Sequence, residues 1–236
     1  MNLSLSRATK ATARAGRAKS FLQRLTLLAV GALMAPGAVP AFAAEPAAAG
    51  HSANATTWSM PGDFDSLGKS DSAWSAGRAD ILDSSSFRAF TDSQDDGQWR
   101  MRNFGDVDLW ENGLVWFATK TAFGFEAGEM VIHPGNSPDK ATAIRWTAPA
   151  AAENTTYHVT GSFRVPADSG DRDFVIRLGD EILFEARGST AAQDFDFEFT
   201  ASAGRMLDFV IGCGNTWTNE GAGFAVTISE KKGAND

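Results

Sequence analysis

The chain has 236 residues, with 29 acidic against 21 basic side chains, a formal net charge of −8 and a single cysteine. This acidic balance argues against DNA, RNA and anionic lipid surfaces as partners. Because Cys213 has no second cysteine to pair with, an intrachain disulfide is excluded and stability must come from the core, to which 17 Phe and seven Trp can contribute.

Residues 1–43 have the organisation of a secretory signal peptide. A basic stretch without acidic residues precedes an apolar run over 25–34, and Ala41-Phe42-Ala43 supplies small residues for cleavage. The apolar run is too short for a membrane-spanning helix. We therefore expect a secreted or periplasmic protein without a membrane span.

The remaining chain fits one domain. Residues 44–56 are Ala-rich and predict a flexible lead, 57–230 predict a single β-sandwich domain, and 231–236 predict a polar tail. Sandwiches of about 200 residues are common as single units. Within the first half we expect short strands at 87–90, 98–102, 114–118, 130–133 and 141–147, with Trp116 and Trp146 packed in the core.

From Thr155 to Ile228 the chain alternates apolar and polar residues with period two, the pattern of half-buried antiparallel strands. Gly179-Asp180 is a two-residue hairpin candidate between two of them. The predicted strands are 155–165, 173–178, 181–187, 194–200, 205–212 and 222–229. Consecutive hairpins whose strands have one apolar and one solvent-exposed face predict an all-β fold, namely an antiparallel β-sandwich of jelly-roll type.

Several short motifs follow one another in an order that resembles a known group of domains. They are Asp63-Phe64, 74–77, 131–135, 144–149, 157–163 and 208–212. The group comprises secreted bacterial jelly-roll β-sandwich domains that resemble carbohydrate-binding modules, of the kind found in PEP-CTERM-type extracellular proteins. The resemblance implies a sandwich fold and an extracellular setting, while its motifs are mainly structural.

Trp217 is the strongest candidate for a ligand contact. It lies in a Gly-, Asn- and Thr-rich connection, 212–223, between the last two predicted strands. A flat exposed ring can stack on a sugar face, and Asn215, Asn219 and Glu220 could add hydrogen bonds. The alternative is that Trp217 packs in the core, as most Trp residues do. Trp99 and Trp110 are weaker candidates.

A second candidate site is the polar face of the sheet formed by the predicted strands of 155–229. On this face we expect His158 and Arg177 to contact a ligand. The simpler interpretation is a solvated face with weak cross-strand ion pairs, and we favour it. The other side chains predicted there are Arg164, Glu185, Arg187, Asp194, Asp196 and Glu198.

Metal and catalytic motifs give little support to an enzyme. Two Asp clusters, at 92–96 and 168–173, allow a structural calcium ion as an alternative. Asp also favours turns, however, and neither cluster has EF-hand spacing. Histidine spacing typical of zinc is missing, and Cys213 predicts a small buried thiol. We therefore expect no catalytic residues and no cofactor.

The sequence favours a secreted non-catalytic module that binds polysaccharide or a cell-surface glycan, or is associated with the extracellular matrix. Two alternatives stay open: a glycan-processing hydrolase or lyase on the same scaffold, and an envelope protein that binds a protein partner. Convergent acids in a cleft would distinguish an enzyme from a binding module.

Overall fold

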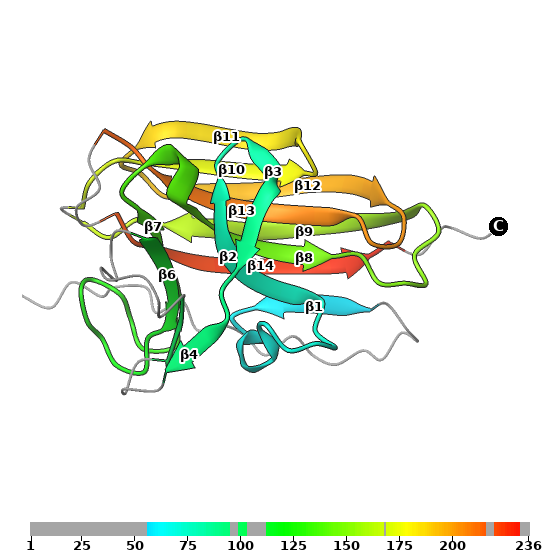
Figure 1. Cartoon of the computed structure of the whole chain (residues 1–236), viewed down its shortest axis with the longest axis horizontal. Coiled ribbons are helices and arrows are strands. Elements are labelled where there is room, and N and C mark those ends of the chain that lie inside the picture. The colour runs from blue at the N-terminus through cyan, green and yellow to red at the C-terminus, as the bar shows by residue number, and fades with distance from the viewer. Residues whose placement is uncertain (1–55, 95–98, 103–111, 168, 216–219, 232–236) are drawn as a thin grey trace, which may run out of the picture. The chain divides into compact units, whose positions relative to one another are not determined.

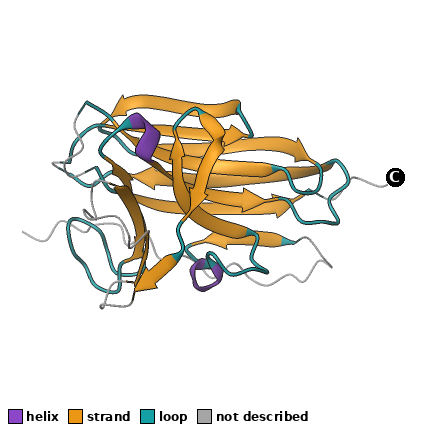
Figure 2. Ribbon diagram, in the orientation of Figure 1, coloured by secondary structure: helices purple, strands orange, loops and turns teal. Residues whose placement is uncertain are grey.

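A computed structural model describes residues 56–94, 99–102, 112–167, 169–215 and 220–231, and for 92–94 and 99–102 it describes the backbone alone. The chain divides into two units, Met1–Ala49 and Gly50–Asp236, and every described residue lies in the second. Strands make up most of the described residues, whose helical content is two short 3₁₀ turns, η1 (Phe64–Ser66) and η2 (Pro138–Lys140) (Figures 1 and 2). Among the described residues, no helix has the length and apolar character needed to cross a membrane.

The larger sheet is antiparallel, with strand order β12-β9-β14-β7-β6-β5-β4, and β1 pairs with β14 beside β7. Its strands are β1 (Thr57–Met60), β4 (Asp92–Gln94), β5 (Trp99–Arg102), β6 (Asn112–Phe117), β7 (Met130–Gly135), β9 (Thr155–Arg164), β12 (Gln193–Ala201) and β14 (Ala222–Glu230).

The smaller sheet is also antiparallel, with strand order β11-β10-β13-β8-β2-β3. Its strands are β2 (Trp74–Asp80), β3 (Asp83–Ala89), β8 (Ala141–Thr147), β10 (Arg172–Leu178), β11 (Glu181–Ser189) and β13 (Met206–Cys213). The two sheets pack into a jelly-roll sandwich, which confirms the predicted fold class.

The main core lies between the two sheets, and alternation in the sequence identifies its residues well. Tyr157, Val159 and Phe163 of β9 are fully buried and contribute to one continuous cluster with the inner residues of β10, β13 and β14. Trp146 is buried in this cluster, and Trp116 is buried in a separate cluster with Phe125 and Val131. The rings interlock: Phe163 stacks on Phe174 of the opposite sheet with centroids 4.6 Å apart. Each such aromatic residue buries a large apolar area.

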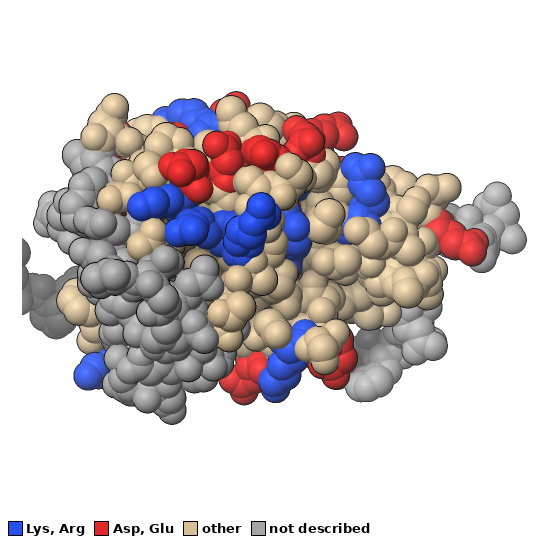
Figure 3. All heavy atoms as spheres, in the orientation of Figure 1, with Lys and Arg blue, Asp and Glu red and all other residues tan. Residues whose placement is uncertain are grey.

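The outer face of the smaller sheet differs from the prediction because it is covered rather than solvated. The chain from β2 into β3 folds over it, and Ala79, Ile81 and Phe87 pack on Val175 and Val210 in a second apolar cluster. The covered face also holds the buried side chains of Arg145, Arg177 and Asp208. Figure 3 shows charges of both signs on this side of the molecule, with a band of Lys and Arg side chains next to a group of Asp and Glu side chains.

The register of β11 corrects a smaller expectation. Alternation predicts that Ile182, Phe184 and Ala186 face the core together. A shift in pairing with β10 places Phe184 opposite Ile176 but Ile182 opposite Arg177, so one extra residue intervenes. Phe184 and Ala186 pack on the core, whereas Ile182 is 43% exposed.

Candidate functional site

Three connections meet at one end of the sandwich: 118–129 between β6 and β7, 165–171 between β9 and β10, and 214–221 between β13 and β14 (Figure 1). Arg164, the last residue of β9, forms a bidentate ion pair with Glu129 and donates from Nη2 to the carbonyl oxygen of Gly124 at 2.9 Å. Gly221 abuts the ring of Phe125, because a Cβ atom there would lie 3.2 Å from it. These contacts join connections that are far apart in the sequence.

The 214–221 connection contains the predicted ligand contacts, although only part of it is described. Trp217 and Asn219 lie outside the described residues, so their proposed roles stay predictions. Asn215 is exposed, and its backbone N–H donates to both carboxylate oxygens of Asp171 at 3.1 Å. Its side-chain Nδ2 donates to Asp171 Oδ2 at 2.6 Å. Asn215 is therefore held in place at the start of the connection.

The other end of this connection turns inward. Glu220 is completely buried, which places it below the surface that a ligand would contact. Burial lowers the pKa of Arg172 to about 10, although Glu220 and Asp171 favour its charged form. The Arg172 guanidinium also donates from Nη2 to the Gly170 carbonyl oxygen at 2.8 Å. Glu220 therefore contributes to the charged interior beneath the loops.

His133 and Cys213 belong to the same buried region. Burial is the main reason that the pKa of His133 falls to about 4, and the positive charge of Arg172 lowers it further. Its Nδ1 lies 2.6 Å from the carbonyl oxygen of Pro134. Burial, followed by the negative charge of Glu220, raises the pKa of the Cys213 thiol. A neutral imidazole and a protonated thiol fit a structural interior.

The 118–129 connection is a tight hairpin with an exposed ring at its tip. Ala122 and Phe125 exchange backbone hydrogen bonds of 3.0 and 2.9 Å, and the two residues between them have positive φ, 55° for Phe123 and 79° for Gly124. This is the pattern of a type I′ turn, whose first central position favours Asn, Asp or Gly. A bulky residue in the left-handed region costs roughly 1–2 kcal/mol.

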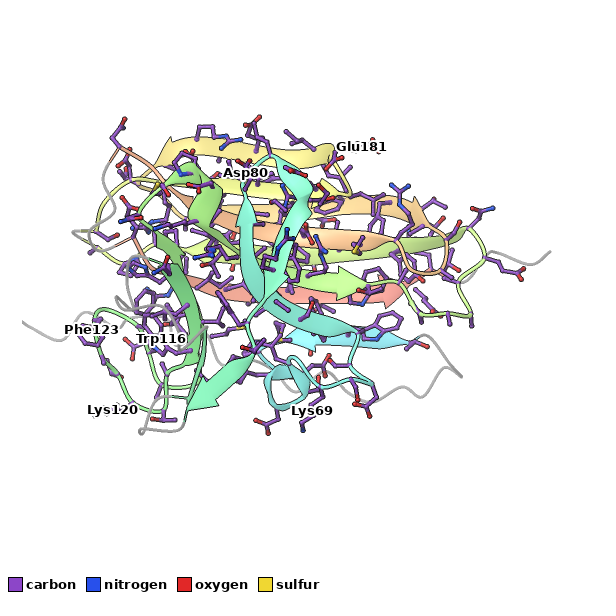
Figure 4. All side chains as sticks on the ribbon, in the orientation of Figure 1. Lys69, Asp80, Trp116, Lys120, Phe123 and Glu181 are labelled. Carbon is purple, nitrogen blue, oxygen red and sulfur yellow. The ribbon has the colours of Figure 1, made fainter. Side chains whose placement is uncertain are left out.

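Phe123 is also 73% exposed, and Figure 4 shows it at the outer end of the connection, beyond Trp116. In the sequence, this region is the connection between the strands predicted at 114–118 and 130–133. The signal that could have identified the residue is Phe-Gly between Ala122 and Phe125, because Gly at the second central position of a two-residue loop predicts positive φ for both.

A shallow groove of about 530 Å³ lies at the base of the same hairpin. Phe64 and Phe117 contribute its aromatic side chains, with ring centroids 5.4 Å apart, while Asp65 and Thr119 add polar groups. Its volume is within the range of small-molecule pockets. Thr119 and Gly128 belong to the hairpin, so the groove and Phe123 share one structural element.

The structure separates His158 from Arg177, which were expected to share one polar face. His158 lies on the outer face of the larger sheet, where its Nε2 contacts Asp196 Oδ1 at 2.7 Å near solvent. Arg177 lies in the smaller sheet with a fully buried side chain. Residues 79–87, which run from the end of β2 into β3 and are called the covering segment below, bury Arg177 so that no ligand at the surface could reach it.

Arg177 instead completes a buried cluster of two arginines and one aspartate. Asp208 accepts from Arg145 Nε at 2.6 Å, from Arg145 Nη2 at 2.8 Å and from Arg177 Nε at 3.1 Å. The covering segment adds two backbone acceptors. The carbonyl oxygen of Ser84 accepts from Arg145 and that of Asp80 accepts from Arg177, each at 2.9 Å. The Phe87 ring lies over the Arg145 guanidinium at 4.0 Å. This cluster fixes three strands and the segment that covers them.

Among the described residues, no group of three or more His, Cys, Asp or Glu side chains could hold a metal ion. Of the predicted Asp clusters, Asp95, Asp96 and Asp168 lie outside the described residues. Asp171 is bonded to Asn215, and Asp173 accepts from the Gly188 backbone N–H at 2.8 Å and from Arg187 at 3.1 Å. These two carboxylates thus contribute to turns and edges, as Asp commonly does.

No family model matches the chain, and no curated protein matches it. Among solved structures, the chain is similar to the CBM51 module of Clostridium perfringens, which was solved in complex with methyl-galactose. The two are 13% identical, the match covers 42% of this chain and 69% of that one, and the TM-score is 0.32. It is similar to the C-terminal CBM6 of a marine laminarinase from Zobellia galactanivorans, with 10% identity, coverage of 65% and 98%, and a TM-score of 0.32. It is also similar to CBM35 from Paenibacillus barcinonensis, with 13% identity, coverage of 75% and 99%, and a TM-score of 0.29.

Proposed function

We propose that this chain is a secreted, non-catalytic module that binds carbohydrate at the loop end of its sandwich, with Trp217 as the principal aromatic contact. The observation that carries the proposal is the anchoring of the 214–221 connection. Asp171 holds the backbone and the side chain of Asn215 at one end, and Gly221 packs on Phe125 at the other. Ordered ends reduce the conformational freedom that a connection loses when a ligand binds.

The polar groups at this end suit a sugar ligand. Asn215 presents an exposed amide, and Asn219 is the second amide that we assign to the ligand. A stacked ring with two or three amide contacts corresponds to micromolar to millimolar affinity, about −4 to −8 kcal/mol. Glu220 is completely buried and favours the charged form of Arg172, so we assign it no ligand contact.

The test begins with a glycan-array screen of the purified chain and continues with calorimetric titration of the best glycan. Trp217→Ala should lose most of the affinity and keep the denaturation midpoint, because a loop ring adds little to the core. His158→Ala, on the outer face of the larger sheet, is the matched control and should bind like wild type. Equal affinities of wild type and Trp217→Ala, with loss in His158→Ala, would move the site to the sheet face.

Export is the second part of the proposal. We expect cleavage after Ala43, because the basic, apolar and small-residue regions follow one another in the order that signal peptidase requires. Mass spectrometry of protein recovered outside the cytoplasm should find an N-terminus at Ala44. Recovered protein that still begins at Met1 would refute it.

A further inference from the structure

The tip of the 118–129 hairpin combines two features that each oppose stability. Phe123 occupies a left-handed backbone conformation that disfavours bulky side chains, and its ring is mostly in water. Asparagine would suit the turn better on both counts. Residues held in unfavourable backbone conformations concentrate at functional sites, so this position calls for a role other than folding.

The rest of the hairpin holds the tip rigidly. Arg164 donates to the Gly124 carbonyl oxygen and lies 5.4 Å from the centroid of the Phe125 ring. Phe125 packs edge-on against Trp116, with centroids 5.6 Å apart. Gly124 also abuts Pro166 of the neighbouring connection, since a Cβ atom there would lie 2.9 Å from the proline Cβ. A ring presented by such a turn loses little freedom when a ligand covers it.

The charges near the tip indicate which ligand suits it. Glu129 is neutralised by Arg164, and Glu126 accepts a hydrogen bond from Thr121 at 2.9 Å, while Lys120 is exposed. These groups leave no net positive patch, so neither an anionic membrane surface nor an acidic polymer is favoured. A phenyl ring offers dispersion contact with the C–H face of a neutral pyranose and no hydrogen bond of its own.

We propose that Phe123 is a stacking platform for a pyranose ring of a neutral polysaccharide bound at the loop end. This inference rests on the proposed carbohydrate-binding function and adds a second aromatic contact to it. The close approach of Phe125 to Gly221 places this hairpin next to the described end of the 214–221 connection. Ligand chains long enough to touch both connections are therefore the preferred ligands.

The experiment compares the mobility of variants in native gels containing barley β-glucan, arabinoxylan or galactomannan, together with their urea denaturation midpoints. Phe123→Asn should raise the denaturation midpoint, because Asn relieves the backbone strain, and should weaken binding at least about tenfold. Phe123→Tyr should bind within about twofold of wild type, because the ring is kept. Leu82→Asn, at another exposed apolar position that is 53% exposed, is the control and should bind like wild type.

Each outcome separates the two claims. If wild type is retarded and Phe123→Asn is retarded equally, the platform is refuted while the binding function stands. If none of the three polysaccharides retards wild type, both the platform and its neutral-glycan ligand are refuted. A lower denaturation midpoint for Phe123→Asn would refute the strain on which the inference is built.

Discussion

Replacing Asp208 by alanine tests the buried cluster that closes the outer face of the smaller sheet. Asp208 accepts three hydrogen bonds from two guanidinium groups, and its side chain and that of Arg177 are completely buried. Its removal leaves two arginines without their counter-charge beneath the segment between β2 and β3. Breaking a buried ion pair on one side typically costs 3–5 kcal/mol, and the sharing of Asp208 by two arginines places this case near 5 kcal/mol.

The matched control is Asp196→Ala, which breaks a pair of similar length near solvent. Asp196 lies 2.7 Å from His158, and the two side chains are 73% and 35% exposed. Water replaces such a contact, so the expected loss is below about 1 kcal/mol. The comparison therefore contrasts a buried carboxylate that two guanidinium groups share with an exposed carboxylate that contacts one imidazole.

The measurement is equilibrium urea denaturation at pH 7, with the free energy of unfolding and its dependence on urea fitted together. If Asp208→Ala does not fold, Asp208→Asn keeps the shape and one acceptor oxygen and should still lose more stability than Asp196→Ala. A loss below about 1 kcal/mol in Asp208→Ala, with an unchanged urea dependence, would refute the reasoning, because it would mean that water reaches both arginines.

Two further predictions concern packing and pH. Phe199→Ala should cost about 3–5 kcal/mol, since Phe199 is buried and stacks on Tyr157 at 5.3 Å, whereas Phe197→Ala should cost less because Phe197 on the same face is only half-buried; equal denaturation midpoints would contradict this difference in burial. For His133, the unfolded chain takes up a proton near pH 6.5 and the folded chain only near pH 4, so stability should fall by up to about 3 kcal/mol as pH drops through this range. His133→Gln should flatten that part of the profile, and parallel profiles would contradict it.

Alternation in the sequence predicts the strands well where one face is buried and the other is wet. On β12, Phe195 and Phe199 are buried while Asp194 and Asp196 are exposed, as period two requires. Alternation also predicts that Phe197 faces the core, but it gives no measure of how deeply. Phe197 does pack on the core but is half-buried, so we expect a smaller loss of stability from its truncation than from that of Phe199.

The outer face of the smaller sheet could not be predicted by the same reasoning. Alternation on β10 treats Arg177 as a solvent-facing residue, just as it treats His158 on β9. The difference between them comes from the chain that runs from β2 into β3, which covers Arg177 from a position 97 residues earlier in the sequence and does not cover His158. One signal was present: Val175 and Val210 are apolar at outward positions, which indicates a covered face.

The candidate site shows the same division between local and distant causes. The boundaries of the 214–221 connection follow from its Gly- and Asn-rich composition, and β13 and β14 flank it as expected. The anchoring of Asn215 by Asp171 depends on two connections that lie 44 residues apart, so no local pattern indicates it. Phe123 is the opposite case, because Phe123-Gly124 between Ala122 and Phe125 is a local signal for a two-residue turn.

These cases suggest one rule for polar and aromatic residues in sandwiches of this kind. A residue that fits its local pattern, such as Asp196 on a wet face, gives little information about function because solvation explains it. A residue that opposes its local pattern must be explained by something beyond its own element. For Asp208, a charge in the interior, that explanation is the pair of arginines that surrounds it. Phe123, an apolar ring in water on a turn that favours Asn, has no such explanation within the described fold, and a ligand that covers the ring would supply one.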